Sequence, residues 1–464
     1  MAHKTEASGE YPWPPGVASI IYDYYFDAPE ILGAGNEMFA LCVDGTLHVC
    51  PHDSSTFHYT DIESIASNDL DPGHVGTKFS ACVVIKRSGE VFTRGDHRAG
   101  GVLEMHAQTA IQAARDRGAY PTSVYHTPGT FAVRFSNGDQ VFWCNTERWQ
   151  PNLGKLDLSK VDTLFTNNWW FAALMKDKTV QTWPAKELPV KLHTEVDHKE
   201  LTGVARIYST WGAFAALRGD GTVVTWGHTY SGGDSRGVNE TLTKVKDIFN
   251  TDYAFAALKE DGTVVTWGHP YEGGDSSDVS KELEKVKGIC AARSAFAAWR
   301  SDGAVVTWGC NAGGDVYSRV AKLPPVIDIK STEVTFGART LDNGFVMWQH
   351  PDTVVKSLVQ DALGSRHVTQ IYSNSVAFTA IADTTAFTPD SWGPSAALDV
   401  TDIGSQPLIR VVSQRENFLA TIGTGDVVAW GQGGIRFVDR GYAHTINEHQ
   451  ASIREAFKNA TGMG

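Results

Sequence analysis

The chain repeats one stretch of 25 residues at a fixed interval of 41. Residues 255–279 read FAALKEDGTVVTWGHPYEGGDSSDV, residues 214–238 read FAALRGDGTVVTWGHTYSGGDSRGV and residues 296–320 read FAAWRSDGAVVTWGCNAGGDVYSRV. Repeats with a period of about 20 to 50 residues mark chains built from one supersecondary unit that cannot bury its apolar surface alone. We therefore expect one repeat domain rather than several unrelated domains.

The pattern extends over most of the chain as an apolar residue twelve positions before a tryptophan. Seven pairs keep both residues: Phe131/Trp143, Phe171/Trp183, Phe214/Trp226, Phe255/Trp267, Phe296/Trp308, Phe336/Trp348 and Phe418/Trp430. Three weaker copies begin at Met38, Cys82 and Phe378. Together they predict ten units between residues 28 and 434, about 40 residues apart. Residues 1–27 and 435–464 then form terminal segments outside the repeat.

Each unit reads as three antiparallel strands. In the best-defined copy, Val245–Thr251, residues 254–260 and residues 263–268 are rich in strand-forming residues. Asp261-Gly262 between the last two is a strong hairpin signal, because glycine adopts the positive φ of a tight turn at no steric cost. The strands are apolar on both faces, so each sheet must be covered on both sides. Sheets stacked around a ring cover one another, which predicts an all-β, propeller-like ring of about ten three-stranded units.

The segments after the third strand vary between units. Val279, Leu283 and Val286 are spaced i, i+4 and i+7, which predicts a short outer helix. Residues 101–117 predict a longer helix in the corresponding place. Two prolines within Lys322–Val326 exclude a regular helix there.

The two ends of the chain suggest how such a ring closes. Ser19–Tyr25 and Gly434–Asp439 are apolar segments beyond the repeat, and each is a candidate strand. A helix is expected from Thr445 onward, because Thr445 and Glu448 form a capping box. We predict a closed ring in which the first 35 residues contact the last 40.

Composition excludes several classes of protein. The sequence has 40 Lys and Arg against 53 Asp and Glu, a formal net charge of −13. This charge repels phosphate backbones, so we expect no nucleic-acid partner. There is no run of about 18 apolar residues and no signal peptide at the N-terminus, so we expect no membrane span and a cytoplasmic location. Export by a non-classical route is the alternative.

The phrase FAAL..DGTVVTWG....GGD resembles the repeat of the regulator of chromosome condensation superfamily. In that family an apolar strand, an Asp-Gly turn and a strand ending in Trp-Gly precede a glycine-rich turn. The resemblance implies a β-propeller, typically of seven blades. The period here is about ten residues shorter, and Gly-Gly-Asp-Ser replaces the family's Gly-Gln-Leu-Gly. Blade number and the founding member's nucleotide exchange on a small GTPase are therefore not carried over to this chain.

Two sets of residues recur at loop positions, where rigid scaffolds carry binding function. The first set is polar-aromatic and follows the third strand: His228, Tyr230, His269 and Tyr271. The second follows the double glycine: Asp234, Asp275 and Asp315. The aspartates are either ligands for calcium or sugar or, as we favour, turn and cap acceptors. The recurring tryptophans are expected to pack between blades rather than to form ligand platforms.

Catalytic signatures are missing from the sequence. There is no Gly-x-Ser-x-Gly, His-Glu-x-x-His, Walker or Rossmann pattern. His48, Cys50 and His52 share one strand face, but ligands from one strand rarely converge on a metal, so we expect neither a metal nor another cofactor. We interpret the protein as a non-catalytic scaffold that binds a protein partner through repeated loops on one face. A lectin-like or toxin-associated glycan-binding module is the alternative, and the oligomeric state stays open.

Overall fold

The computed structural model describes residues 30–34, 37–41, 47–51, 57–67, 81–97, 100–127, 130–144, 156–167, 170–184, 193–194, 196–310, 316–321, 323–348, 354–355, 367–374, 377–382, 385–387, 408–413, 417–422, 427–431 and 436–437. In this part of the chain the strands form ten antiparallel sheets, five with three strands and five with four. The prediction of ten units is confirmed, and half of the units gain one strand beyond the predicted three.

The first five sheets follow the chain order. Their strands are β1 (Glu30–Ala34), β2 (Glu37–Leu41), β3 (Leu47–Pro51) and β4 (Phe57–Tyr59); β5 (Ile62–Ser67), β6 (Ala81–Lys86) and β7 (Val91–Gly95); β8 (Pro121–Thr127), β9 (Thr130–Phe135) and β10 (Gln140–Cys144); β11 (Val161–Thr166), β12 (Trp170–Met175) and β13 (Val180–Pro184); β14 (His193–Thr194), β15 (Val204–Ser209), β16 (Ala213–Arg218) and β17 (Val223–His228). In the fifth sheet β14 pairs with β17 as an outer fourth strand, although it precedes β15 in the chain.

The remaining five sheets repeat this plan. Their strands are β18 (Val245–Asn250), β19 (Ala254–Lys259) and β20 (Val264–Gly268); β21 (Val286–Ala291), β22 (Ala295–Arg300), β23 (Val305–Cys310) and β24 (Val316–Ala321); β25 (Val326–Ser331), β26 (Phe336–Thr340), β27 (Phe345–Trp348) and β28 (Val354–Val355); β29 (Val368–Ser373), β30 (Phe378–Ala382) and β31 (Thr385–Phe387); β32 (Leu408–Ser413), β33 (Asn417–Ile422), β34 (Val427–Gly431) and β35 (Arg436–Phe437).

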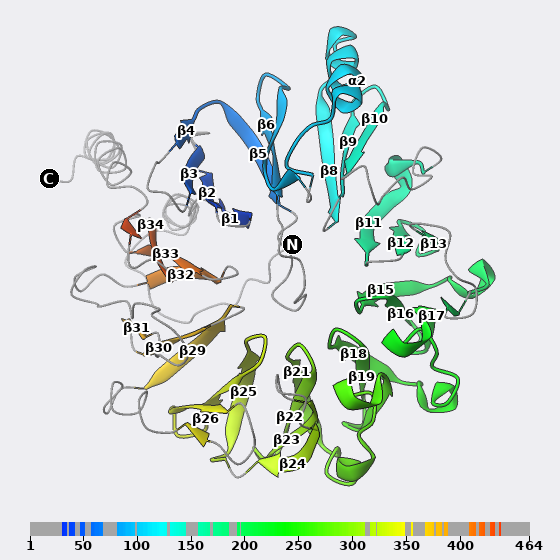
Figure 1. Cartoon of the computed structure of the whole chain (residues 1–464), viewed down its shortest axis with the longest axis vertical. Coiled ribbons are helices and arrows are strands. Elements are labelled where there is room, and N and C mark those ends of the chain that lie inside the picture. The colour runs from blue at the N-terminus through cyan, green and yellow to red at the C-terminus, as the bar shows by residue number, and fades with distance from the viewer. Residues whose placement is uncertain are drawn as a thin grey trace, which may run out of the picture.

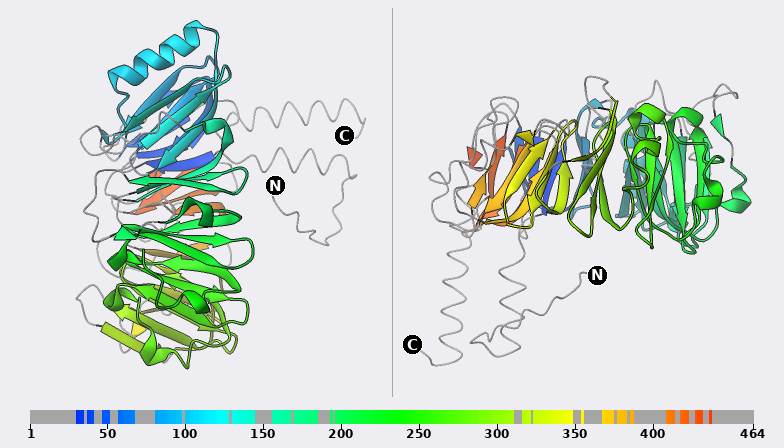
Figure 2. Two further views of the ribbon diagram at one scale, coloured as in Figure 1. Left: turned by 90° about the vertical axis from the view of Figure 1, so that its right-hand side faces the viewer. Right: turned by 90° about the horizontal axis from the view of Figure 1, so that it is seen from below.

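The sheets stand around a central axis as the blades of a propeller-like ring. From β1 to β32, the first long strand of each blade contacts that of the next blade. Figure 1 shows these strands innermost, with β1–β4 beside β32–β34 at the point where the ring closes. Figure 2 shows the same ring from the side as a flat disc one strand-length thick. Most of the residues in the predicted contact between the first 35 and the last 40 residues lie outside the described part of the chain, and that contact stays a prediction.

The Asp-Gly hairpin closes the outer pair of strands in each well-defined blade. Gly262 has φ of +80°, and its N–H donates to the carbonyl of Lys259 at 3.0 Å. The Asp261 carboxylate accepts the N–H of Thr263 at 2.9 Å and its hydroxyl at 2.6 Å. The turn is therefore fixed locally, and it places Phe255 opposite Trp267 in the ladder.

The core lies between the blades rather than within any one of them. Phe255, Ala257 and Trp267 face the preceding blade, whereas Ala256 and Leu258 face the following one. Small alanines let neighbouring sheets approach closely, and the bulky rings fill the wider gap toward the rim. The prediction that each sheet is covered on both faces by its neighbours is therefore confirmed.

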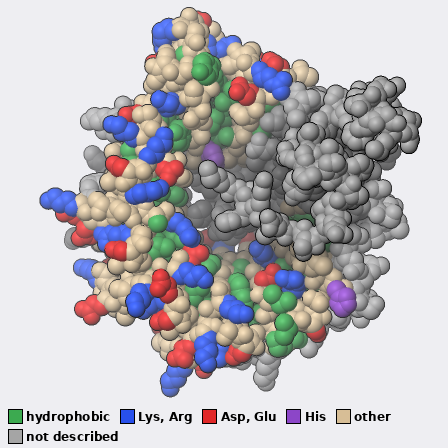
Figure 3. All heavy atoms as spheres, turned by 180° about the vertical axis from the view of Figure 1, so that it is seen from behind, with side chains coloured by type: hydrophobic (Ala, Val, Ile, Leu, Met, Phe, Trp, Pro, Cys, Tyr) green, Lys and Arg blue, Asp and Glu red, His purple; other side chains and the backbone are tan. Residues whose placement is uncertain are grey.

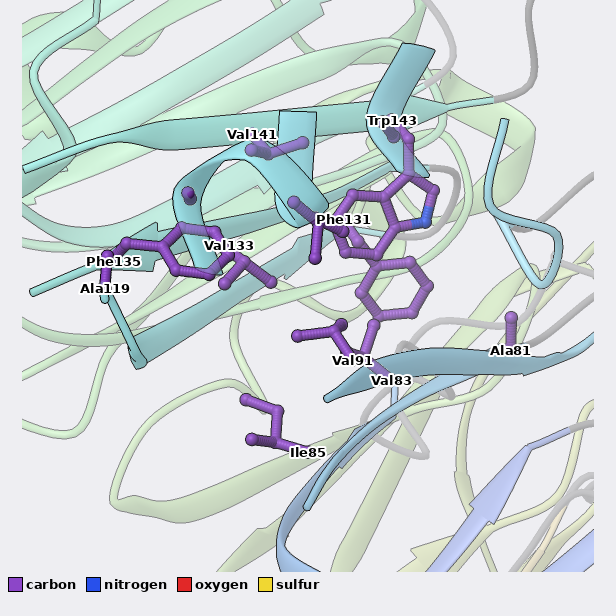
Figure 4. Packing of buried hydrophobic residues seen from close by; sticks show 13 residues of the cluster. Ala81, Val83, Ile85, Val91, Ala119, Phe131, Val133, Phe135, Val141 and Trp143 are labelled. Atoms are coloured by element: carbon purple, nitrogen blue, oxygen red, sulfur yellow. The ribbon is translucent and has the colours of Figure 1, made fainter. Parts of the chain in front are cut away.

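A close view of one gap shows how two blades share a core. Val83 of β6 and Val91 of β7 point toward Phe131 and Val133 of β9, and Trp143 of β10 packs alongside (Figure 4). The Phe131 and Trp143 rings are stacked with centroids 5.7 Å apart. Helix α2 (Met105–Asp116) closes the outer end of this gap with three buried residues, Ala107, Ile111 and Ala114.

The short helices predicted after the third strand are not α-helices. Turns of 3₁₀-helix occupy these places: η6 (Thr229–Ser231), η7 (Asn239–Thr241), η8 (Pro270–Glu272) and η9 (Ser277–Val279). Val279 and Leu283 are buried as predicted, but Val286 is the first residue of β21. Lys285, with φ of +56°, ends the outer segment immediately before that strand. The helix predicted over residues 101–117 is present as α2.

Candidate functional site

One end of the ring collects two loops from every blade. In an antiparallel unit, the turn between the first and second strands lies at the same end as the loop that leaves the third strand. On four successive blades, from β15 to β27, we call this surface the loop face. It comprises residues 210–213, 228–237, 251–254, 269–276, 292–295 and 332–335.

Threonine holds the two loops of a blade together. The hydroxyl of Thr251 accepts the N–H of Ala254 at 3.0 Å and lies 3.0 Å from the carbonyl of Glu272, to which it donates. One blade earlier, the Thr210 hydroxyl donates to the carbonyl of Ser231 at 2.7 Å. The hydroxyl thereby fixes the loop after the third strand against the turn between the first two strands.

The predicted His and Tyr residues occupy equivalent places on adjacent blades. The main-chain N–H of His228 donates to Gly212 at 2.8 Å, and that of His269 donates to Tyr253 at 2.9 Å. His228 and Tyr230 have ring centroids 6.0 Å apart, and those of His269 and Tyr271 are 5.9 Å apart. Burial lowers the pKa of His228, so its imidazole is neutral near pH 7.

The two histidines are half-buried in these loops, whereas the two tyrosines are exposed. Tyr230 is 61% exposed and Tyr271 is 65% exposed. Trp211, in the turn between β15 and β16, is 40% exposed, and Val334, in the turn between β25 and β26 three blades further on, is exposed at the same end of the ring. Four of the nine large apolar side chains exposed in the described part of the chain therefore lie on the loop face.

Rings also meet across the boundary between two blades. Trp211 lies 5.7 Å from Tyr253 between ring centroids, and Tyr253 lies 6.4 Å from His269. With Tyr271 these residues form a continuous chain of four rings that begins and ends at an exposed side chain. Aromatic rings in such chains combine apolar area with little conformational freedom.

An open groove of about 720 Å³ runs between the loops of two blades. Its lining residues are Thr229, Tyr230, Asp234, Arg236, Gly237, Gly268 and Pro270. Tyr230 and Asp234 thus share one groove, while His269 and Tyr271 belong to the loop that forms its far wall. The groove is wide and open to solvent, unlike the enclosed pockets that hold small molecules.

The predicted aspartates act locally in turns. Asp234 accepts the N–H of Arg236 at 3.1 Å and forms a two-pronged ion pair with its guanidinium, which lowers the pKa of this carboxyl. Asp275 accepts the N–H of Ser277 at 2.9 Å. Both carboxylates therefore occupy the turn positions that we favoured for them. Asp315 lies outside the described residues.

The sequence did not single out one charged pair at the loop face. Arg293 Nε lies 3.1 Å from Asp252 Oδ2, and the pair joins neighbouring blades. Burial raises the pKa of Asp252 to about 6, and the charges of Glu272 and Glu333 act in the same direction against the hydrogen bond from Arg293. The sequence contains one signal for this pair. Residues 211, 252 and 293 occupy the same position in three otherwise similar copies of the repeat, but they are Trp, Asp and Arg.

A belt of main-chain hydrogen bonds fixes this variable position. The N–H of Trp211 donates to the carbonyl of Asp252 at 2.7 Å, that of Asp252 to Arg293 at 2.9 Å, and that of Arg293 to Glu333 at 3.0 Å. Side chains at this position are therefore displayed at a regular interval on a frame that does not depend on their identity.

The described residues include no group of three or more His, Cys, Asp or Glu side chains arranged to hold a metal ion. The His48 and Cys50 side chains, like His52, lie outside what the structure describes. Among the described residues, no helix has the length and hydropathy to cross a membrane.

No protein-family model matches the chain, and a search of curated proteins finds no match. Solved structures do match, at low identity. Yeast RCC1 (Prp20), solved with Kap60 bound, is 12% identical with a TM-score of 0.31, over 97% of this chain and 99% of that one. The CRINKLY WD40 ectodomain of the Arabidopsis thaliana receptor kinase ACR4 is 13% identical with a TM-score of 0.29, over 62% and 98%. At these TM-scores the architecture rests on the strand order of this chain itself.

Proposed function

We propose that this protein is a non-catalytic scaffold that binds a protein partner through its loop face. One observation carries the proposal: Trp211, Tyr230 and Tyr271 are exposed together on successive blades. Tryptophan, tyrosine and arginine are the residues that contribute most to protein–protein interfaces. A folded chain gains nothing in stability from three large rings left in water, so a binding role explains their grouping better than packing does.

The rest of the loop face has the features of a preorganised interface. The Thr251 hydroxyl and the main-chain belt hold the loops before any partner arrives. A rigid surface loses little conformational freedom on binding, which favours affinity. The open groove beside Tyr230 suits an extended segment of chain better than a compact small molecule.

Charge on another part of the surface also fits a protein partner. Figure 3 shows one face of the ring, where Lys and Arg alternate with Asp and Glu around the described rim. On this part of the surface no continuous basic stripe is present for a phosphate backbone to follow. The absence of a nucleic-acid partner, of a cofactor and of catalysis, and the cytoplasmic location, remain part of the proposal.

Selection from a displayed random-peptide library tests the function. The immobilised protein should enrich peptides, and Trp211→Ala/Tyr230→Ala/Tyr271→Ala should bind those peptides at least about tenfold more weakly. Tyr120→Ala/Leu341→Ala is the matched control, because it removes two exposed side chains, 62% and 69% exposed, at the opposite end of the ring. Equal loss in both variants would contradict the assignment of the face.

A glycan array probed with the same proteins tests the alternative function, which is glycan binding. Binding of glycans that depends on Tyr230 and Tyr271, with no peptide enriched, would replace the protein partner by a sugar. Both tyrosines offer flat, exposed rings on which a sugar could stack.

A further inference from the structure

The loop face carries charged side chains as well as aromatic rings. Three carboxylates accompany the chain of four rings: Asp252 and Glu272 are sequence neighbours of Tyr253 and Tyr271, and Glu333 accepts the main-chain N–H of Arg293 through its carbonyl. Arg293 is the cation paired with them, through its 3.1 Å contact with Asp252. With every group ionised, these four residues carry two uncompensated negative charges.

The electrostatic influence of these carboxylates reaches the neighbouring groups. The pKa of Tyr253 is raised by burial and by the charges of Asp252 and Glu272. The pKa of Cys310, one blade further on, is raised by burial and by Glu272. The charge of Glu272 therefore acts on a ring of its own blade and on a group of the next blade.

One oxygen of this group has no hydrogen-bond partner among the described residues. Glu272 Oε2 is fully buried and accepts nothing, and His269 Nδ1 in the same loop is also buried without a partner. Leaving a buried carboxylate oxygen unpaired is costly. The Glu272 residue as a whole is only half-buried, so solvent and an incoming donor can reach part of the side chain.

Rings and carboxylates together select one kind of ligand. A cation is attracted to the face of Trp or Tyr and gains further from nearby carboxylates. Trp211 and Tyr271 supply exposed rings at the two ends of the chain, and the carboxylates lie alongside. An acidic or phosphorylated segment would meet net negative charge and be repelled.

We propose that the loop face binds a lysine- or arginine-bearing extended segment of the partner protein. The cationic head lies against Glu272 and Glu333, with its stem across Tyr253 and Tyr271. This inference rests on the proposed function and names the chemistry of the partner.

Fluorescence anisotropy with labelled oligoarginine, oligolysine and oligoglutamate peptides tests the inference. We expect both cationic peptides to bind and oligoglutamate not to bind. Glu272→Gln/Glu333→Gln should weaken binding about tenfold. Glu260→Gln/Glu284→Gln is the charge-matched control, since both glutamates are exposed at the opposite end of the ring, and it should leave affinity unchanged.

A second pair of variants separates the rings from the general negative charge of the chain. Tyr271→Ala should weaken oligoarginine binding, and Tyr120→Ala should not. Circular dichroism and thermal melting establish that each variant is folded. Equal affinity in all variants, or equal binding of oligoglutamate, overturns the inference.

The outcomes distinguish this inference from the function on which it rests. If display selects peptides that depend on the loop face but oligoarginine does not compete with them, the scaffold function stands and the cationic partner is wrong. If display enriches no peptide that depends on the loop face, the function itself fails.

Discussion

The indole Nε1 of Trp267 donates a hydrogen bond to the main-chain carbonyl of Gly232, with 3.0 Å between the two atoms. The residues belong to adjacent blades and are 35 positions apart. Trp308 makes the same bond to Gly273 one blade later, again at 3.0 Å. In these two blades the tryptophan thus joins the blade to the loop of the blade before it, which explains why Trp-Gly and Gly-Gly recur together in the best-conserved copies of the repeat.

Replacing Gly232 should destabilise the ring. Its φ is +93°, and an added Cβ would lie 2.6 Å from the ring of Phe255 in the next blade. We expect Gly232→Ala to lower the free energy of unfolding by about 2–4 kcal/mol, measured by chemical denaturation. Gly237→Ala is the control, because a Cβ there meets nothing within 4 Å. Similar losses in both variants would contradict this account of the double glycine.

The tryptophan bond itself can be measured by comparing two buried tryptophans. Trp267 is bonded to Gly232, whereas Trp348 Nε1 has no partner among the described residues. Trp267→Phe leaves the Gly232 carbonyl without its donor, so it should cost about 1–2 kcal/mol more than Trp348→Phe in the same denaturation experiment. If the Trp348 variant loses as much or more, the bond contributes nothing measurable.

Asp252 should make stability depend on pH in an unusual direction. Burial raises its pKa from 3.8 to about 6, so the folded protein holds this proton more tightly than the unfolded chain. Its contribution to stability is therefore complete below pH 3.8 and is lost as the pH rises to about 6.

Comparison with Asp252→Asn isolates this contribution, because the amide does not titrate. The difference in unfolding free energy, wild type minus variant, should fall by about 2–3 kcal/mol between pH 3.8 and pH 7. Arg293, Glu272 and Glu333 are the charged groups that act on Asp252, and all are kept in the variant. A difference that rises over this range would show that the ion pair with Arg293 outweighs burial.

Thr251 should control the order of the Tyr271 loop. Thr251→Val removes the hydroxyl that bonds Ala254 and Glu272, and we expect a loss of about 1–2 kcal/mol in the free energy of unfolding and faster amide exchange at residues 271–274. Thr251→Ser keeps the hydroxyl and should retain slow exchange. Equal amide-exchange rates in the two variants would show that the Thr251 hydroxyl does not order this loop.

The strands of the repeat were predictable because each is determined locally. Residues 254–258 are apolar at every position and therefore on both faces of the strand, and Asp261-Gly262 fixes the turn without help from the rest of the fold. The ring follows from sheets that are apolar on both faces. The outer segments were wrong in detail, because Val286 matches a helical spacing but belongs to the next strand, and Lys285 at positive φ separates the two.

The binding surface was only half predictable. Tyr230 and Tyr271 recur in near-identical loops, so the repeat itself draws attention to them. Trp211, Asp252 and Arg293 do not recur as residue types, and they meet only because blades 41 residues apart stack side by side. Contacts of this kind depend on the three-dimensional offset between blades, which residue spacing within one unit does not reveal.

The belt from Trp211 through Asp252 and Arg293 to Glu333 uses main-chain atoms alone. A duplicated unit therefore enters the ring with its register already specified, whatever side chain it has at this position. Each new copy adds one more display site whose residue can be exchanged without breaking this belt. An indole, a carboxylate and a guanidinium at three successive sites show how far such exchange has gone here, so the recognition properties of the ring can diversify much faster than its architecture.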